Sequence, residues 1–272
     1  EWAMTQNNLG NLLQVHGERL TNREGIPFLA EAEAAFRAAL HVQSEVSTPV
    51  PWSMTQNNLA LVLSAQAELL PGKDGASKLT QAITAYRAAL RVYSEAETPN
   101  LWAKTQNALG AAHRTLGERL AGSGGWTHLL QALPPLRAAL RVYSETESPA
   151  LWAMTQNNLG NVLTAQGERI AGSLGEARLT EAVTAFRAVL RVYSEVEDPT
   201  GWAMAQNNLG SVYSILGERT TGSKSIVNLT EAQTAYRVAL RVFLQHGDSK
   251  YAQVVDENLI LVEQLIEARK VD

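Results

Sequence analysis

The chain of 272 residues is long enough for one large domain or two ordinary ones, and its apolar content of 45% supplies a substantial core. These values exclude an intrinsically disordered or collagen-like chain. A formal net charge of −4 lacks the basic excess typical of proteins that bind a phosphate backbone, so nucleic acid is not an expected partner.

The chain has no cysteine, which excludes disulfides, thiolate metal sites and a cysteine nucleophile and agrees with a reducing compartment. No apolar run approaches the roughly 18 residues of a membrane span, and no basic-then-apolar signal segment opens the chain. We therefore expect a cytoplasmic protein that makes no membrane contact.

A tryptophan recurs every 50 residues and opens a similar block each time, such as WAMTQNNLGNLL at 2–13 and WAMTQNNLGNVL at 152–163. A second block recurs in step with it, as LAEAEAAFRAAL at 29–40 and LTEAVTAFRAVL at 179–190. Self-similarity at a fixed period indicates a repeat array, not separate domains. The predicted repeats cover residues 1–50, 51–100, 101–150, 151–200 and 201–248.

Within each repeat the first element, about residues 2–20 in the first copy, has apolar residues on one side and favours a helix. The following segment, for example 71–78, is rich in Gly, Ser and charge and predicts a loop. A second helix follows, with its N-cap expected at Thr80, Thr180 and Thr230 in three of the repeats. Prolines stand between repeats, at positions where helices tend to stop: Pro49, Pro99, Pro149 and Pro199.

The third repeat departs from the others because Pro134 and Pro135 fall inside its second helix. Two consecutive prolines remove two backbone donors, so we expect this helix to start late or to kink. Residues 249–272 resemble a first helix, with Asn258-Leu259 at the Asn-Leu position, and are expected to form a C-terminal capping helix.

A single helix pair cannot bury so wide an apolar stripe, so neighbouring repeats must stack into a solenoid. A small residue follows the central Leu of each first helix, which allows close approach of the facing helix: Gly10, Ala60, Gly110, Gly160 and Gly210. The tryptophans are expected in the core, with stacking on a ligand as the alternative. An Arg in each second helix, Arg37 in the first copy, is expected to pair with a Glu of the first helix, there Glu18.

The pattern NNLGN, then GER, then L-x-EA-x-x-A-[FY]-R-A-x-L and a closing proline resembles the tetratricopeptide repeat over almost the whole chain. The 50-residue unit exceeds the family's usual 34 residues and is similar to the long repeats of kinesin light chain. Similar long repeats occur in bacterial signalling proteins, attached to CHAT proteases or to NTPases. The resemblance implies an all-α fold, a right-handed superhelix of antiparallel helix pairs whose first helices line a concave groove.

Asparagine precedes the central Leu in every repeat, although it is a middling helix former. A carboxamide both donates and accepts, which matches the backbone of an extended peptide, and in the resembling families an Asn ladder holds peptide in this way. The alternative is that one Asn of each pair bridges adjacent helices, and the sequence leaves open which one faces the groove. The predicted ladder comprises Asn7, Asn57, Asn107, Asn157 and Asn207 with Asn8, Asn58, Asn158 and Asn208, while Asn11 and Asn161 share their face.

Methionines share this face in four repeats, and Lys104 replaces the methionine in the third, which also carries Arg114. Because charges are otherwise scarce, the face suits an uncharged or mildly apolar segment better than a phosphopeptide. Lys104 and Arg114 are a candidate specificity point, with sequence drift as the alternative, and inter-repeat packing is the alternative for the methionines.

The sequence predicts a protein-interaction scaffold that binds a peptide or protein segment and is not an enzyme. No catalytic motif is present, and the five histidines lack metal-ligand spacing, so no cofactor or metal is expected. Two alternatives stay open: a regulatory or sensor region of a larger bacterial signalling effector, and an array that associates end to end. Glu1-Trp2 begins inside a repeat, which suggests a piece of a longer chain or a first helix that packs on something else.

Overall fold

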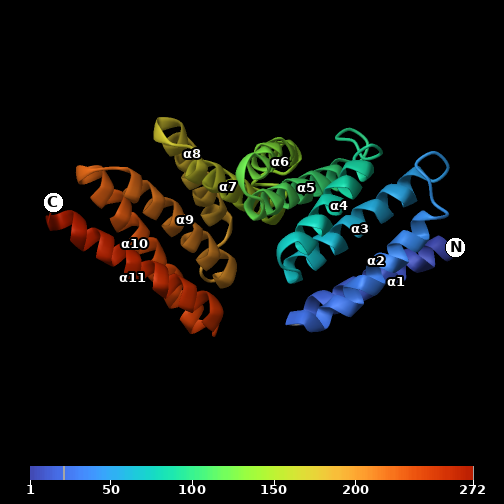
Figure 1. The fold of residues 1–272 in the computed structure, drawn as a ribbon, viewed down its shortest axis with the longest axis horizontal. Helices are drawn as coiled ribbons and strands as arrows, with labels where there is room; N and C mark the ends of the chain where they lie inside the picture. Colours follow the sequence, from blue (N-terminus) through green and yellow to red (C-terminus); the bar gives the residue numbers. More distant parts are fainter. Residues whose placement is uncertain (21, 272) are drawn as a thin grey trace. The chain divides into compact units, whose positions relative to one another are not determined.

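The computed structural model describes residues 1–20 and 22–271, and within them it contains α-helices, one 3-10 helix and no strand (Figure 1). The first helices of the repeats are α1 (Trp2–Arg19), α3 (Pro49–Leu69), α5 (Pro99–Arg119), α7 (Pro149–Arg169) and α9 (Pro199–Arg219). The second helices are α2 (Ile26–Leu40), α4 (Gly72–Ala89), α6 (Gly122–Val142), α8 (Gly172–Val192) and α10 (Gly222–Gln245). The 3-10 helix η1 (Asn22–Gly25) precedes α2, and α11 (Ser249–Val271) ends the described chain.

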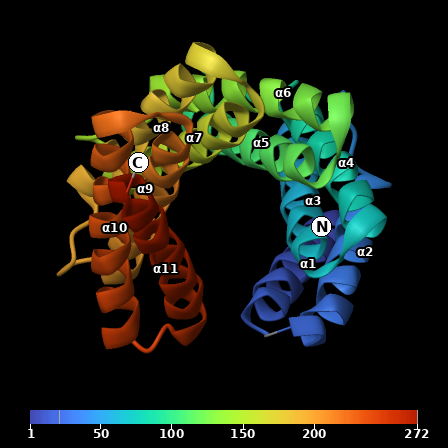
Figure 2. The ribbon, with the colours of Figure 1, turned by 60° about the vertical axis from the view of Figure 1, so that its left-hand side comes forward.

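The chain divides into two compact units, Glu1–Val142 and Tyr143–Asp272. In the first unit α1 pairs with α2, α3 with α4 and α5 with α6, while α2 also packs on α3 and α4 on α5 (Figure 1). The second unit repeats the arrangement with α7 to α10, and α11 lies along α10 in the place of a further first helix (Figure 2). The predicted all-α array of stacked helix pairs with a C-terminal helix is confirmed.

The predicted loop between the helices of a pair is wrong in the second to fifth repeats, whereas in the first α1 ends at Arg19 and α2 begins only at Ile26, after η1. Two residues, such as Leu70 and Pro71, separate α3 from α4, and a connection this short makes the pair antiparallel. The second helix then begins at a glycine with a positive φ, +57° at Gly72 and +69° at Gly172, a conformation that only glycine adopts readily. The variable Gly- and Ser-rich segments are therefore the first turns of the second helices, not loops.

The predicted threonine N-caps are wrong for the same reason, because the second helices start eight residues earlier. Thr80, Thr180 and Thr230 lie in mid-helix, where each hydroxyl donates to the carbonyl four residues before it. The prolines between repeats also differ from expectation, since each one opens the following first helix at position N1, where a missing N–H costs nothing.

The second helix of the third repeat does not start late, so of the two predicted outcomes only a kink at the prolines stays a prediction. α6 runs unbroken from Gly122 to Val142 through Pro134 and Pro135. Pro134 and Leu130, the residue whose carbonyl loses its N–H partner, are both exposed to water, while Leu133 and Leu136 are buried.

The predicted close approach of the helices in each pair is confirmed at the small residues. A methyl group at Gly10 would lie 2.6 Å from the Phe36 ring, and one at Gly160 would lie 2.7 Å from Phe186. Both rings are fully buried, and Ala32 and Ala182 on the same second helices have no exposed surface. The first, fourth and fifth pairs thus place an aromatic ring of the second helix on a glycine of the first, whereas in the third pair Leu136 lies on Gly110.

The tryptophans divide between core and surface. Trp52 is 9% exposed, whereas Trp2 is 52% exposed, so the expectation of a uniformly buried column is wrong. An arginine lies over three of the rings, with its guanidinium carbon 5.3–5.4 Å from the ring centre: Arg91 on Trp52, Arg141 on Trp102 and Arg191 on Trp152. These cation–π contacts cover the outer face of each ring.

The ion pairs that join repeats also differ from the predicted ones. Arg37 pairs with Glu33 of its own helix, whereas Glu18 accepts from Gln14. The tryptophan-covering arginines instead reach back to a glutamate in the junction before their repeat: Arg91 to Glu45, Arg141 to Glu95, Arg191 to Glu145, and likewise Arg241 to Glu195. None of the described helices is both long and apolar enough to cross a membrane.

Candidate functional site

Part of the predicted set of binding residues lies on an accessible stripe of the first helices. In α3 this stripe runs through Met54, Asn58, Leu61 and Glu68, which recur at spacings of three and four and therefore share one side of the helix. We call this stripe, together with its counterparts on the other first helices, the Asn face. The methionines on it are exposed by 37–63%: Met4, Met54, Met154 and Met204.

The first asparagine of each pair is turned toward the next repeat. In the first unit the Asn7 Oδ1 accepts from the Thr55 hydroxyl and from the Asn58 amide, each at 3.2 Å. One repeat later the Asn57 Oδ1 accepts from the Thr105 hydroxyl at 3.0 Å. These bonds join first helices of adjacent repeats and use the asparagine as a bridge, the alternative that the sequence left open.

The second unit shows the same bridge in reduced form. The Asn157 Oδ1 accepts from the Asn208 amide at 3.0 Å, and the threonine hydroxyl is missing because position 205 is Ala. Asn207 keeps a buried Oδ1 that has no hydrogen-bond partner among the described residues, since Val255 of α11 stands where the earlier repeats have a threonine. Asn107, in the first unit, is 5% exposed.

The second asparagine of each pair lies on the Asn face. The Asn58 amide nitrogen donates to the Oδ1 atoms of Asn7 at 3.2 Å and Asn11 at 3.0 Å, and these two bonds fix the orientation of the carboxamide. Its Oδ1 makes no hydrogen bond to any described residue, and the same holds for Asn208. Asn8 is exposed, while Asn158 and Asn161 are half-buried in the second unit.

The two basic residues of the third repeat lie apart on α5. Lys104 is exposed near the start of the helix and makes no ion pair within the described chain. Arg114 lies ten residues further on, about 15 Å along the axis at 1.5 Å per residue. It is paired with Glu118 at 2.6 Å, which neutralises its charge. They do not form one cationic cluster.

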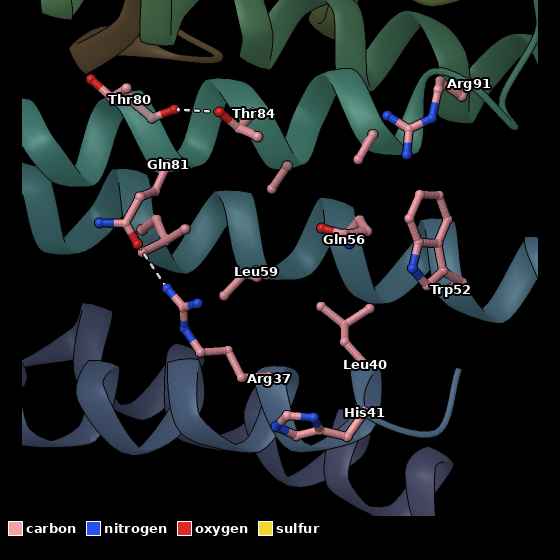
Figure 3. Close-up of a pocket in the computed structure, with 13 residues that line it drawn as sticks. Arg37, Leu40, His41, Trp52, Gln56, Leu59, Thr80, Gln81, Thr84 and Arg91 are labelled. Carbon is pink, nitrogen blue, oxygen red and sulfur yellow. Dashed lines mark hydrogen bonds between the residues drawn. The ribbon is translucent and has the colours of Figure 1, made fainter. Parts of the chain in front are cut away.

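A cavity that the sequence did not indicate lies on the other side of the array, between α2 and α4 (Figure 3). It has a volume of about 650 Å³ and a floor formed by Trp52, Leu59 and Leu63 of α3. Arg37 on one wall donates to Gln81 on the other at 2.7 Å, and Arg91 lies near the Trp52 ring. None of the asparagines lines it.

A histidine pair in the third repeat is a second feature that the sequence did not indicate. His113 of α5 and His128 of α6 approach with 3.0 Å between their Nδ1 atoms, and the Arg87 guanidinium lies 3.3 Å from the His113 Nε2. Burial first, and then the charges of Arg87 and His128, lower the pKa of His113 to about 4. The pair is therefore neutral at pH 7 and part of the packing between the two helices.

Comparison with known proteins adds a likeness of fold. No family model and no curated protein matches the sequence. Among solved structures, a chain in the crystal structure of the APC/C hetero-tetramer Cut9–Hcn1 matches 98% of this chain at 15% identity with a TM-score of 0.45. The match covers 48% of that chain, so this chain spans about half its length. The helix pairs and their fixed spacing confirm an all-α array of helical repeats.

Proposed function

We propose that this chain is a protein-interaction module that binds an extended segment of a partner along the Asn face of its units. The observation that carries the proposal is the held carboxamide of Asn58: two neighbouring asparagine oxygens fix its nitrogen and leave its Oδ1 without a partner in the described chain. An amide fixed in advance loses less conformational entropy when it binds.

The surroundings of this amide suit a mildly apolar segment. Met54 and Leu61 flank Asn58 on the stripe, and a flexible thioether adapts to side chains of different shape. Backbone N–H groups of an extended segment would donate to the Oδ1 atoms of Asn58 and Asn208, while the methionines contact its side chains. Recognition of this kind depends on backbone geometry more than on partner sequence.

The test is selection of binders from a library of random peptides on the full chain, followed by affinity measurements on variants. We expect Asn58→Ala, Asn158→Ala and Asn208→Ala together to weaken binding of the selected peptides by about tenfold or more, because each neutral hydrogen bond contributes about 0.5–1.5 kcal/mol. Backbone N-methylation of a selected peptide should weaken its binding by a similar factor.

The matched control changes a neighbouring polar residue on the same helices. Gln56→Ala, Gln156→Ala and Gln206→Ala together remove three amides of similar exposure, and Gln56 lines the cavity on the other side of α3. The control should leave peptide affinity unchanged. Equal losses in the two triple variants, with both folded by circular dichroism, would place the binding elsewhere.

Self-association through α1 is a second candidate function, and a specific exposure favours it. Leu9 and Leu12 of α1 are exposed by 44% and 68%, whereas Leu59 and Val62, their counterparts 50 residues later, are exposed by 6% and 0%. An uncovered apolar face of this kind is typical of an interaction surface. Light scattering over a concentration series should show a rise in mass that Leu12→Gln abolishes; a constant mass for the unaltered chain would refute this role.

A further inference from the structure

Arginines of one repeat bind the end of the first helix of the repeat before it. The Arg219 guanidinium donates to the carbonyl oxygens of Gly167 at 2.6 Å, Glu168 at 2.6 Å and Ile170 at 2.8 Å, all at the C-terminus of α7. In the first unit Arg119 donates in the same way to the Leu70 carbonyl at the end of α3, at 3.1 Å.

We call this set of carbonyl oxygens at the end of a first helix the arginine cradle. It suits a cation because the last carbonyls of a helix have no intrahelical partner and carry the negative end of the helix dipole. A glycine at the start of the second helix makes room for the guanidinium: a methyl group at Gly175 would lie 2.7 Å from the Arg219 Nη1. The guanidinium fork reaches several carbonyls at once, as Arg219 does with three.

The first repeat has the residues that correspond to the cradle but lacks the arginine, and the nearest neighbours of a methyl group at Gly25 would be backbone atoms of Gly17, its carbonyl oxygen first. Its carbonyls belong to Gly17, Glu18 and Leu20, which stand 150 residues before the three partners of Arg219, and Gly25 corresponds to Gly175. The position that would supply the arginine, 50 residues before Arg119, is Leu69. The three residues Gly-Glu-Arg that end the first helix in the other repeats are replaced in the second repeat by Ala67, Glu68 and Leu69.

A cavity of about 430 Å³ lies at this place, lined by Gly17, Glu18 and Leu20 on one side and by Leu69 and Glu68 on the other. At about 30 Å³ per water molecule this volume holds roughly a dozen waters, which is ample for the four heavy atoms of a guanidinium group. Glu68 is exposed and makes no ion pair or hydrogen bond within the described chain. The cavity is therefore lined both by residues at the end of α1 and by a glutamate that has no ion pair within the described chain.

We infer that this cavity is a binding site for a guanidinium group, the side chain of an arginine presented by a partner. Two observations carry the inference: the filled cradles at Arg119 and Arg219, and the cavity where Leu69 replaces their counterpart. Leu29 and Leu61 add apolar wall along which the methylene stem of an arginine can lie. An ammonium group has no planar fork to span the carbonyls and should bind more weakly.

The cavity meets the Asn face, because Leu61 and Glu68 belong to both. A segment lying over Asn58 could thus place an arginine side chain in the cradle; this extension rests on the proposed function. The guanidinium site itself does not, since it is tested with a small probe that does not use the asparagines.

The experiment titrates the full chain with N-acetyl-argininamide and follows backbone amide signals by NMR. We expect saturable shifts at Gly17 and Gly25. N-acetyl-citrullinamide, which has the same shape without the charge, and N-acetyl-lysinamide should each bind at least about tenfold more weakly. Saturable shifts of Gly17 and Gly25 with calcium chloride instead of the arginine derivative would overturn the assignment to a guanidinium group.

Two variants and a control locate the site. Leu69→Arg places the missing side chain in the cradle and should abolish binding of N-acetyl-argininamide, while Leu69→Met, which keeps the cavity uncharged, should leave it unchanged. Glu68→Gln removes the free carboxylate without altering the packing and should weaken binding several-fold, which keeps the test valid if Leu69→Arg does not fold. Unchanged binding in folded Leu69→Arg or in Glu68→Gln, or no shift at Gly17 and Gly25 in the unaltered chain, would refute the inference.

Discussion

Replacing Arg219 by leucine copies the natural state of the second repeat into the fifth. The change removes three hydrogen bonds of 2.6–2.8 Å between the guanidinium and the end of α7. A hydrogen bond to a charged group contributes about 1.5–3 kcal/mol, and ordering a long arginine side chain costs about 2 kcal/mol. The freed carbonyl oxygens can accept hydrogen bonds from water instead, because the site is only partly buried. With the lower value for each of the three bonds and the ordering cost subtracted, the expected loss in free energy of unfolding is about 2–3 kcal/mol.

The assay is urea denaturation of the full chain followed by circular dichroism, with hydrogen exchange at the last turn of α7 as the local measurement. Arg219→Leu should lower the urea midpoint and speed exchange there, whereas exchange at the end of α3, which Arg119 serves, should not change. The variant should also gain a site for N-acetyl-argininamide at Gly167 and Gly175. A loss below about 0.5 kcal/mol, with exchange unchanged, would show that the arginine is not a stabilising contact and would refute the reasoning behind the cradle.

Three further predictions concern packing and titration. Gly160→Ala should destabilise the chain by about 1–3 kcal/mol, because the new methyl group lies 2.7 Å from the buried Phe186 ring; Gly124→Ala, with nothing within 4 Å, should instead stabilise it by up to about 1 kcal/mol, both measured in urea. Burial and Arg87 lower the pKa of His113 from 6.5 to about 4, so the unfolded chain binds the proton first and stability should fall as pH drops from 6.5 toward 4. His113→Gln should remove that part of the pH dependence, and an unchanged urea midpoint profile would contradict it. The hydrogen bond from Arg191 lowers the pKa of Glu145, an effect that Arg191→Gln should abolish in an NMR titration of the carboxyl group; an unaltered titration would show that the pair does not form in solution.

The repeat and its core followed from the sequence alone. A 50-residue period with apolar residues at spacings of three and four specifies helix pairs that stack, because no other arrangement covers every stripe. The close approach of the two helices at the small residues was also predicted, but the partner that fills the space, such as the Phe36 ring at Gly10, came from the structure. Local signals were less dependable, and Thr80 lies in mid-helix although it resembles an N-cap.

The tertiary structure decided which side chains of different repeats meet. Helical periodicity places Asn57 and Asn58 about 100° apart but does not say which of them faces the neighbouring helix, and the bond from Thr105 to Asn57 spans 48 residues. Nothing in the sequence shows that Leu69 stands where other repeats have a helix-capping arginine; this follows from the contact of Arg219 with the end of α7, 49–52 residues away. The sequence by itself determined the helices and their apolar faces. The polar contacts between repeats depend instead on the rotation and offset of the packed helices, which only the folded array fixes.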